Sequence, residues 1–290
     1  MSTSEFDLAS SFEALSHALG TRYALERVIG RGGTSLVYLA RDLTTDRPVA
    51  VKFLRSEVAA GLGAARFLRE IRYASRLEHP RIVPIIDSGD ANSLLYLVMP
   101  YVDGESLREL LDREQKLTLK EALRLTRQVA EALSFAHSRN IVHRDVKPEN
   151  ILLLHGDALV VDFGIAKALS STGNVAITGE SVSVEGVFIG TPLYMAPEQV
   201  FSDQPVDERA DIYGLATVLY EMLDGRPPFE GLTNMAILSK KSARPAPPPS
   251  NSLEPLPAHA VSALMKALER DRTQRFSSVA DFTTALASPL

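Results

Sequence analysis

Four side chains that could bind a cation and a phosphate occur close together in the segment 143–164. They are Asp145, Lys147, Asn150 and Asp162. Carboxylate and amide oxygens suit a hard cation such as Mg²⁺, which usually binds through one or two carboxylates plus substrate phosphates. A lysine ammonium adds a point charge for phosphate. Any one of these residues alone would more often belong to a buried ion pair, but the whole ordered set favours a cation and phosphate site.

Two short apolar runs frame these residues. The runs 151–154 and 159–161 are separated by the polar turn His155-Gly156-Asp157, and this pattern predicts a β-hairpin. One compact unit would therefore hold the four side chains close together. A long helix is predicted over 118–138, with Thr118 as N-cap and a capping box formed with Glu121. This helix leads the chain to His143.

The first hundred residues have a mostly β pattern. Strands are predicted over 23–29, 36–40, 49–54, 82–86 and 94–99, and a helix is predicted over 59–78. A turn containing Gly30 and Gly32 joins the first two strands, and such a turn lets backbone N–H groups approach a ligand. A helix would follow a dinucleotide-binding turn, whereas the residues that follow here alternate as in a strand. Lys52 alone fits a strand edge and Glu70 alone fits a solvated helix face, but together they could form a functional ion pair.

The remainder of the chain is mostly helical. Besides the helix over 118–138, helices are predicted over 106–112, 211–223, 258–269 and 277–287, and the residues 100–104 are expected to connect two lobes. The segment 165–190, rich in Ser, Thr and Gly, is expected to be a mobile loop. The proline-rich segment 243–257 is either a ligand for an SH3-type domain or, as we prefer, a surface connector. Residues 1–20 are either a short helix or an unstructured tail.

Composition narrows the class of protein. The chain has 290 residues, a formal net charge of −5 and no cysteine. The acidic balance argues against a nucleic-acid-binding domain, and the lack of cysteine excludes disulfides and favours a reducing compartment. No apolar run approaches the roughly 20 residues that span a bilayer, and the N-terminus lacks the features of a signal peptide. We expect a cytoplasmic chain or the cytoplasmic part of a longer, membrane-anchored protein.

Five motifs follow one another in an order typical of one family. They are Gly30-x-Gly32 through Val37, Val49-Ala50-Val51-Lys52, His143-Arg144-Asp145 with Asn150, Asp162-Phe163-Gly164, and Ala196-Pro197-Glu198. From about residue 23 to residue 287 the chain resembles a serine/threonine protein kinase, close to the bacterial receptor-like kinases. The resemblance implies an α+β, two-lobed fold. It would comprise a partly helical N-terminal extension (1–22), an antiparallel β-sheet N-lobe with one main helix (23–99), a hinge (100–104) and a larger, mostly α-helical C-lobe (105–290).

The resemblance also implies a role for each motif residue. Asp145 would accept the proton of the substrate hydroxyl, with Lys147 and Thr191 beside it. Asn150 and Asp162 would bind Mg²⁺ or Mn²⁺. ATP would be bound by Ile29, Gly30, Arg31, Gly32, Gly33, Thr34, Ser35, Val37, Lys52, Glu70, Met99, Tyr101 and Val102.

Further residues follow from the same resemblance. Arg144 would pair with a phosphorylated residue of the activation loop, for which Ser183, Ser181 and Thr178 are candidates and Glu185 a partial mimic of phosphate. Glu198 would pair with Arg275. Asp211 would cap the backbone of the catalytic loop, the stretch that begins with His143-Arg144-Asp145. Ser35, Pro100 and Tyr213 depart from the usual residues of the family, and none of the three replaces a catalytic group.

The expected function is transfer of the ATP γ-phosphate to Ser or Thr hydroxyls of proteins. We expect the substrates to include the chain's own activation loop, within the segment 165–190, which one copy would phosphorylate on another when two copies associate. Lys147 and Thr191 favour the serine/threonine class. One alternative is a nucleotide-binding pseudokinase scaffold, although Lys52, Asp145 and Asp162 are all present. Another is a small-molecule phosphotransferase, against which the segment 190–198 argues.

Overall fold

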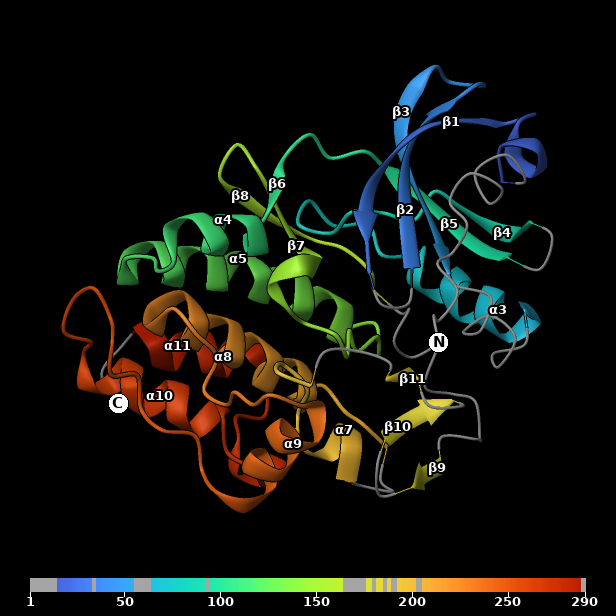
Figure 1. The fold of residues 1–290 in the computed structure, drawn as a ribbon. Helices are drawn as coiled ribbons and strands as arrows, with labels where there is room; N and C mark the ends of the chain where they lie inside the picture. The colour runs from blue at the N-terminus through green and yellow to red at the C-terminus, as the bar shows by residue number, and fades with distance from the viewer. Residues whose placement is uncertain are drawn as a thin grey trace. The chain divides into compact units, whose positions relative to one another are not determined.

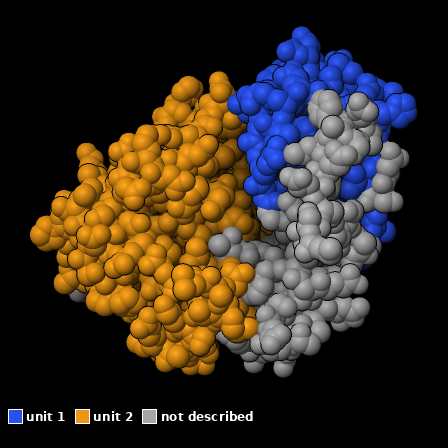
Figure 2. All heavy atoms as spheres, viewed as in Figure 1, with its two compact units in different colours: residues 1–76, 84–101 blue, residues 77–83, 102–290 orange. Residues whose placement is uncertain are grey.

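A computed structural model describes residues 15–32, 35–54, 64–91, 94–163, 176–178, 181–184, 187–188, 192–201 and 205–287. The chain divides into two compact units (Figure 2). Unit 1 comprises residues 1–76 and 84–101, and unit 2 comprises residues 77–83 and 102–290.

Unit 1 is built on a five-stranded antiparallel sheet with the strand order β1-β2-β3-β5-β4 (Figure 1). Its strands are β1 (Tyr23–Arg31), β2 (Ser35–Asp42), β3 (Arg47–Leu54), β4 (Asp87–Ala91) and β5 (Leu94–Pro100), and its helix is α3 (Ala64–Ala74). Tyr23, Tyr38 and Phe53 form the centre of the core. Residues 15–19 are helical, and Leu15 and Leu19 pack into this core. After the glycine turn the chain continues as β2, so the strand expected there is confirmed.

One strand prediction was wrong. The segment 82–86 contributes only an isolated bridge from Ile82 to Val160, and the strand follows at β4. Pro84 interrupts the segment, and proline has no N–H for a ladder. The sequence of β4, Asp-Ser-Gly-Asp-Ala, shows no apolar alternation. This strand lies at the edge of the sheet, and its backbone pairs only with β5. The helix predicted over 59–78 is confirmed for α3 and ends earlier than expected, while residues 59–63 lie outside the described residues.

Unit 2 is mostly helical. Its helices are α4 (Leu107–Glu114), α5 (Leu119–His137), α7 (Glu198–Phe201), α8 (Arg209–Asp224), α9 (Asn234–Ala243), α10 (Ala258–Ala267) and α11 (Val279–Ala287), with the 3₁₀ turns η1 (Pro148–Asn150) and η2 (Arg272–Gln274). A small antiparallel sheet has the order β6-β7-β8, with β6 (Glu105–Ser106), β7 (Ile151–Leu154) and β8 (Asp157–Val160). Helix α8 contacts α5, α10 and α11 (Figure 1). All residues of α8 from Ala210 onward are buried, as its apolar sequence predicted.

Three helices of unit 2, α4, α5 and α9, begin at a residue whose side chain accepts a backbone N–H, whereas α8 and α10 begin without such a cap. Thr118 caps α5 by accepting from the backbone N–H of Glu121, as predicted. The Glu121 carboxylate contacts Arg124 at 3.2 Å, so the described contacts support the N-cap and not the reciprocal half of the capping box. A full capping box occurs instead at the start of α4, between Ser106 and Glu109.

Within the segment 165–190, which was expected to be a mobile loop, the described residues form strands. Three short strands, β9 (Ala176–Thr178), β10 (Ser181–Val184) and β11 (Val187–Phe188), pair antiparallel in the order β11-β10-β9. The alternation Ser181-Val182-Ser183-Val184 was the signal for a strand.

None of the helices in the described ranges is long and apolar enough to cross a bilayer.

Candidate active site

The hairpin predicted within the segment 143–164 is confirmed by the pairing of β7 with β8. Its strands pair from Ile151 with Val160 to Leu154 with Asp157. The turn residues His155 and Gly156 have φ values of 52° and 84°, a combination typical of a tight type I′ connection. The backbone N–H of Val161 donates to Asn150 O at 3.0 Å. The hairpin thus places Asn150 opposite the start of the Asp162 segment.

Asp145, Lys147 and Asn150 form one hydrogen-bonded group. Lys147 Nζ lies 2.5 Å from Asp145 Oδ2, and Asn150 Nδ2 donates to the same oxygen at 3.0 Å and to the Asp145 carbonyl at 2.8 Å. Both donors reach one carboxylate oxygen. Among the described residues, Asp145 Oδ1 accepts no hydrogen bond, and the side chain remains 26% exposed. One oxygen is therefore fixed by the protein, while the other can accept a proton from a bound molecule.

The charge on Lys147 is supported by its surroundings. Burial acts to lower the pKa of this ammonium, but the negative charge of Asp145 and the hydrogen bond to it outweigh burial. The charges of Glu149 and Asp162 act in the same direction, so the pKa of Lys147 is raised. Lys147 is therefore a fixed cation, and Asp162 lies close enough for its charge to contribute. Asp162 itself has a φ of 71°, in the left-handed region.

The catalytic-loop backbone is anchored to the buried Asp211 of α8, as predicted. Asp211 Oδ2 accepts from the backbone N–H of His143 at 2.8 Å and lies 2.7 Å from His137 Nε2, and Oδ1 accepts from the backbone N–H of Arg144 at 2.7 Å. Burial acts to raise the pKa of Asp211, but these donors lower it below its ordinary value. Arg144 has a φ of 69°, a conformation that costs about 1–3 kcal/mol for a residue other than glycine. The bonds to Asp211 stabilise this conformation.

Hydrogen bonds of His143 and the close approach of Gly214 complete the loop. The backbone N–H of Asp145 donates to His143 Nδ1 at 3.2 Å, so Nδ1 is the acceptor and Nε2–H donates to Val161 O at 2.8 Å. His143 thereby joins the catalytic loop to the strand that leads to Asp162. At Gly214 of α8, an added Cβ would lie 3.0 Å from Val146 Cβ. The absence of a side chain at Gly214 lets the helix backbone approach the loop.

The residues expected to hold ATP fall mainly in unit 1. Ile29, Gly30 and Arg31 lie in β1, Ser35 and Val37 in β2, Lys52 in β3, Glu70 in α3 and Met99 in β5. The turn between β1 and β2 is closed by the Gly32 N–H, which donates to Ser35 O at 2.9 Å. Tyr101 follows β5 and donates its N–H to Pro48 O at 3.3 Å, and Val102 begins the second part of unit 2. Gly33, Thr34 and Thr191 lie outside the described residues.

The segment 192–198 is fixed to the core of unit 2 by buried polar contacts. The Tyr194 hydroxyl donates to Glu221 of α8, and Arg108 of α4 binds both groups. Burial and the charge of Glu221 raise the pKa of Tyr194. The predicted pair of Glu198 with Arg275 is confirmed, with two N–O distances of 2.7 Å and an Arg275 side chain that is fully buried.

Sequence reasoning did not identify three residues that hold the segment 192–198 in place, namely Arg108, Gln199 and Lys241. Arg108 lies on a short helix that was predicted, but nothing local indicates a buried partner 113 residues away. Gln199 accepts from Ala196 N–H and donates to Arg144 O, both within 2.9 Å, and so joins the segment to the catalytic loop. Lys241 belongs to α9, a helix that was not predicted. The start of α9 carried a signal, because Thr233 is its N-cap.

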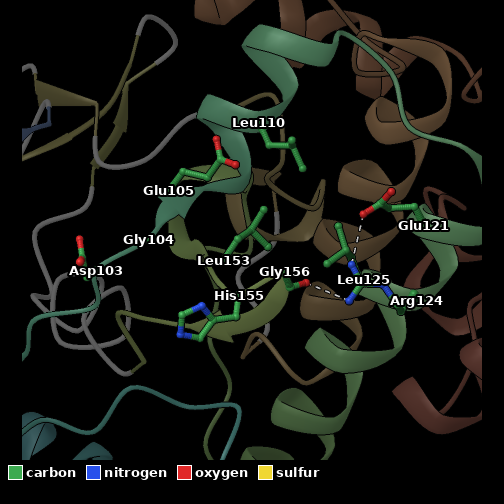
Figure 3. Close-up of a pocket in the computed structure, with 10 residues that line it drawn as sticks. All are labelled: Asp103, Gly104, Glu105, Leu110, Glu121, Arg124, Leu125, Leu153, His155 and Gly156. Carbon is green, nitrogen blue, oxygen red and sulfur yellow. Dashed lines mark hydrogen bonds and ion pairs between the residues drawn. The ribbon is translucent and has the colours of Figure 1, made fainter.

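A separate cavity of about 390 Å³ lies in unit 2 and holds none of the expected site residues. Asp103, Glu105, Glu121, Arg124 and His155 contribute its polar lining (Figure 3). Most of these charges already have partners. Glu105 pairs with Arg113, while Arg124 contacts Glu121 and donates to Gly156 O at 2.9 Å.

The donor set at the catalytic loop fits a hard divalent cation. The Nδ2 of Asn150 is turned to Asp145, and no residue in the described ranges donates to its Oδ1, the atom that a cation would need. Asp162 supplies a carboxylate within range of Lys147. Within the described residues no group of three His, Asp or Glu side chains forms a metal cluster. One carboxylate and one amide suit a cation that takes its other oxygens from phosphates and water.

Comparisons with known proteins agree with this geometry. The protein kinase domain family model matches residues 23–289. The chain belongs to the protein kinase family. Serine/threonine-protein kinase PknB of Mycobacterium tuberculosis is 40% identical over 274 residues, covering 92% of this chain and 43% of that protein. Serine/threonine-protein kinase PrkC of Bacillus subtilis is 39% identical over 262 residues, covering 90% and 39%.

A solved structure gives the same result for the fold. The crystal structure of the kinase domain of M. tuberculosis PknI, in a mutant form, matches with a TM-score of 0.71 and 31% identity, covering 91% of this chain and 94% of that one. The expected α+β kinase fold, with a small antiparallel sheet in one unit and a larger helical unit, is therefore confirmed. The chain spans less than half the length of the curated relatives that it matches.

Proposed function

We propose that this kinase domain transfers the γ-phosphate of ATP to serine and threonine hydroxyls of protein substrates. The observation that carries the proposal is the asymmetric environment of Asp145, in which Lys147 and Asn150 hold one carboxylate oxygen and no described residue uses the other. That second oxygen would accept the proton of the attacking hydroxyl and orient it. The family and its named serine/threonine kinase members support this class of acceptor.

The remaining groups of unit 2 would act by position and charge. Lys147, kept cationic by the carboxylates around it, would neutralise charge that develops on the transferring phosphoryl group. Asp162 and Asn150 would hold Mg²⁺, or Mn²⁺ in its place, and a bound cation would neutralise the phosphates and orient them. Thr191 would hydrogen-bond to Asp145 and Lys147. We further propose that the segment 190–198 receives the substrate polypeptide and that the domain acts in the cytoplasm.

Unit 1 would bind the nucleotide. We propose that Lys52 contacts the α and β phosphates with Glu70 as its positioning partner. The N–H groups of the turn at 30–35 would cover the phosphates, and Val37 would contact the adenine. Met99, Tyr101 and Val102 would form the adenine-binding edge. Since Pro100 has no N–H, Val102 would supply the backbone donor.

Transfer of label from γ-labelled ATP to a generic basic protein, followed by phosphoamino-acid analysis, tests this proposal. We expect phosphoserine and phosphothreonine, without phosphotyrosine. A protein that binds ATP and Mg²⁺ but transfers no label would be a pseudokinase and would overturn the proposal. Label transferred to small alcohols and not to protein would indicate a small-molecule phosphotransferase.

We also propose that the domain phosphorylates its own activation segment by self-association. Thr178, Ser181 and Ser183 lie on the paired strands β9 and β10, and Arg144 of the catalytic loop is the expected partner of a phosphate there. Mass spectrometry after incubation with ATP should find phosphate between residues 176 and 188, at a rate that rises with protein concentration. A segment without phosphate after full turnover of a test substrate would refute this step.

A further inference from the structure

The lysine at position 241 is buried in the core of unit 2. Its side chain lies on α9 and the residue is only 2% exposed, whereas the neighbouring Lys240 is partly exposed. Lysine is seldom fully buried unless it is paired. Burial, followed by the positive charge of Arg275, lowers the pKa of Lys241 to about 7. Contacts must offset the cost of placing this group inside the protein.

The contacts of Lys241 are made to one stretch of backbone. Its Nζ donates to the carbonyl oxygens of Leu193 and Met195, each at 2.7 Å, and lies 5.1 Å from the centre of the Tyr213 ring. No carboxylate of the described residues lies within ion-pair distance of it. The hydrogen-bonding capacity of this buried amine is therefore directed to two alternate carbonyls of the segment 192–198.

The same segment is held at other points by different elements. The side chain of Tyr194, between the two carbonyls, is bound by Glu221 of α8. Gln199 ties Ala196 to the Arg144 carbonyl in the catalytic loop at 2.8–2.9 Å. Lys241 is the contact that comes from α9. It fixes the backbone of residues 193–195, while the other contacts fix a side chain and the end of the segment.

We propose that Lys241 is a positioning residue for the protein substrate: by holding the Leu193 and Met195 carbonyls, it sets the backbone shape on which the acceptor polypeptide lies. The inference rests on the proposed function, because the proposed function assigns the segment 190–198 to substrate binding. The inference separates binding of the polypeptide substrate from binding of ATP. Loss of Lys241 should weaken binding of the polypeptide and leave ATP binding unchanged, since Lys241 makes no described contact with an expected nucleotide-binding residue.

The test compares Lys241→Met with Lys240→Met, the same substitution one residue away on α9. Lys240 donates to the Glu230 carbonyl and not to the segment. Without the two hydrogen bonds that hold the Leu193 and Met195 carbonyls, the KM for a basic peptide containing Ser and Thr should rise by about tenfold or more. The KM for ATP should stay within about twofold, since no contact to ATP is removed. Lys240→Met should leave both constants at their wild-type values.

A second measurement does not depend on activity. Amide hydrogen exchange of residues 192–196 should be faster in Lys241→Met than in wild type and unchanged in Lys240→Met. If Lys241→Met does not fold, Lys241→Gln, which keeps an N–H donor group without the charge, replaces it in both assays. A folded Lys241 variant with wild-type peptide KM and wild-type exchange would overturn the inference. A wild-type protein without kinase activity would refute the proposed function, and the exchange data would still decide whether Lys241 holds the segment.

Discussion

The substitution Asp211→Asn should uncouple the catalytic loop from helix α8. Asp211 is 1% exposed and accepts from the backbone N–H groups of His143 and Arg144 at 2.8 and 2.7 Å, with His137 Nε2 at 2.7 Å. Asparagine has nearly the same shape but only one acceptor oxygen. Its NH₂ group must therefore face at least one of these donors. The change removes charge and acceptor capacity without creating a cavity.

The magnitude follows from the number of bonds affected. A hydrogen bond to a charged group contributes about 1.5–3 kcal/mol, and an unmatched buried donor costs about 1–3 kcal/mol. Losing one such bond and leaving one N–H unmatched should lower the free energy of unfolding by about 3 kcal/mol. The left-handed conformation of Arg144, with φ 69°, would also lose support, so Asp145 should move and turnover should fall.

Urea unfolding and steady-state kinetics measure the two effects. Asp112→Asn is the matched control, because Asp112 is 66% exposed and its contact with Arg108 is 3.4 Å long. The control should change the free energy of unfolding by less than about 0.5 kcal/mol and leave kcat unchanged. An Asp211→Asn protein as stable as the control, with wild-type kcat, would refute the view that Asp211 holds the loop.

Three further tests concern buried charges and close packing in unit 2. Glu198→Gln should lower the free energy of unfolding by about 3 kcal/mol in urea titration, because the fully buried Arg275 loses its carboxylate; a change below about 1 kcal/mol would contradict this. For Lys241, whose pKa is lowered to about 7, the folded protein loses a proton near pH 7 that the unfolded chain keeps until about pH 10.4. The stability of wild type relative to Lys241→Met should therefore rise by about 1.5 kcal/mol between pH 7 and pH 8.5, and a flat difference would exclude this titration. Gly104→Ala should lower the unfolding midpoint, because the added Cβ would lie 2.1 Å from the Leu153 carbonyl oxygen; an unchanged midpoint would show that the backbone can shift there at no cost.

The elements around the catalytic loop could be predicted because their signals are local. The apolar runs of β7 and β8 are joined by a polar turn, and helix α8 is apolar nearly all round. Two elements that were missed, β4 and α9, lack a comparable apolar pattern along their length. The polar β4 forms a strand only because β5 pairs with it, and the α9 sequence contains two adjacent lysines, of which one is buried through contacts that come from residues 193 and 195.

The candidate site shows the same division. The identity of Asp145, Asn150 and Asp162 as a group follows from their order in the chain. Their geometry depends on positive φ values at Arg144 and Asp162, which no local rule predicts for these residue types. The supports of that geometry come from distant parts of the chain, because Asp211 contacts His143 across 68 residues. Sequence reasoning located Asp211 only through resemblance to the family.

Turnover by Asp145→Asn, measured beside ATP affinity, tests the central claim most directly. The substitution removes the carboxylate that would accept the hydroxyl proton and keeps the size of the side chain. Since positioned acid–base groups contribute about 10²–10⁴-fold, kcat for phosphorylation of a test protein should fall at least about 100-fold, with ATP affinity within about twofold of wild type. A variant that binds ATP normally and retains wild-type kcat would contradict the assignment of Asp145 and the mechanism built on it.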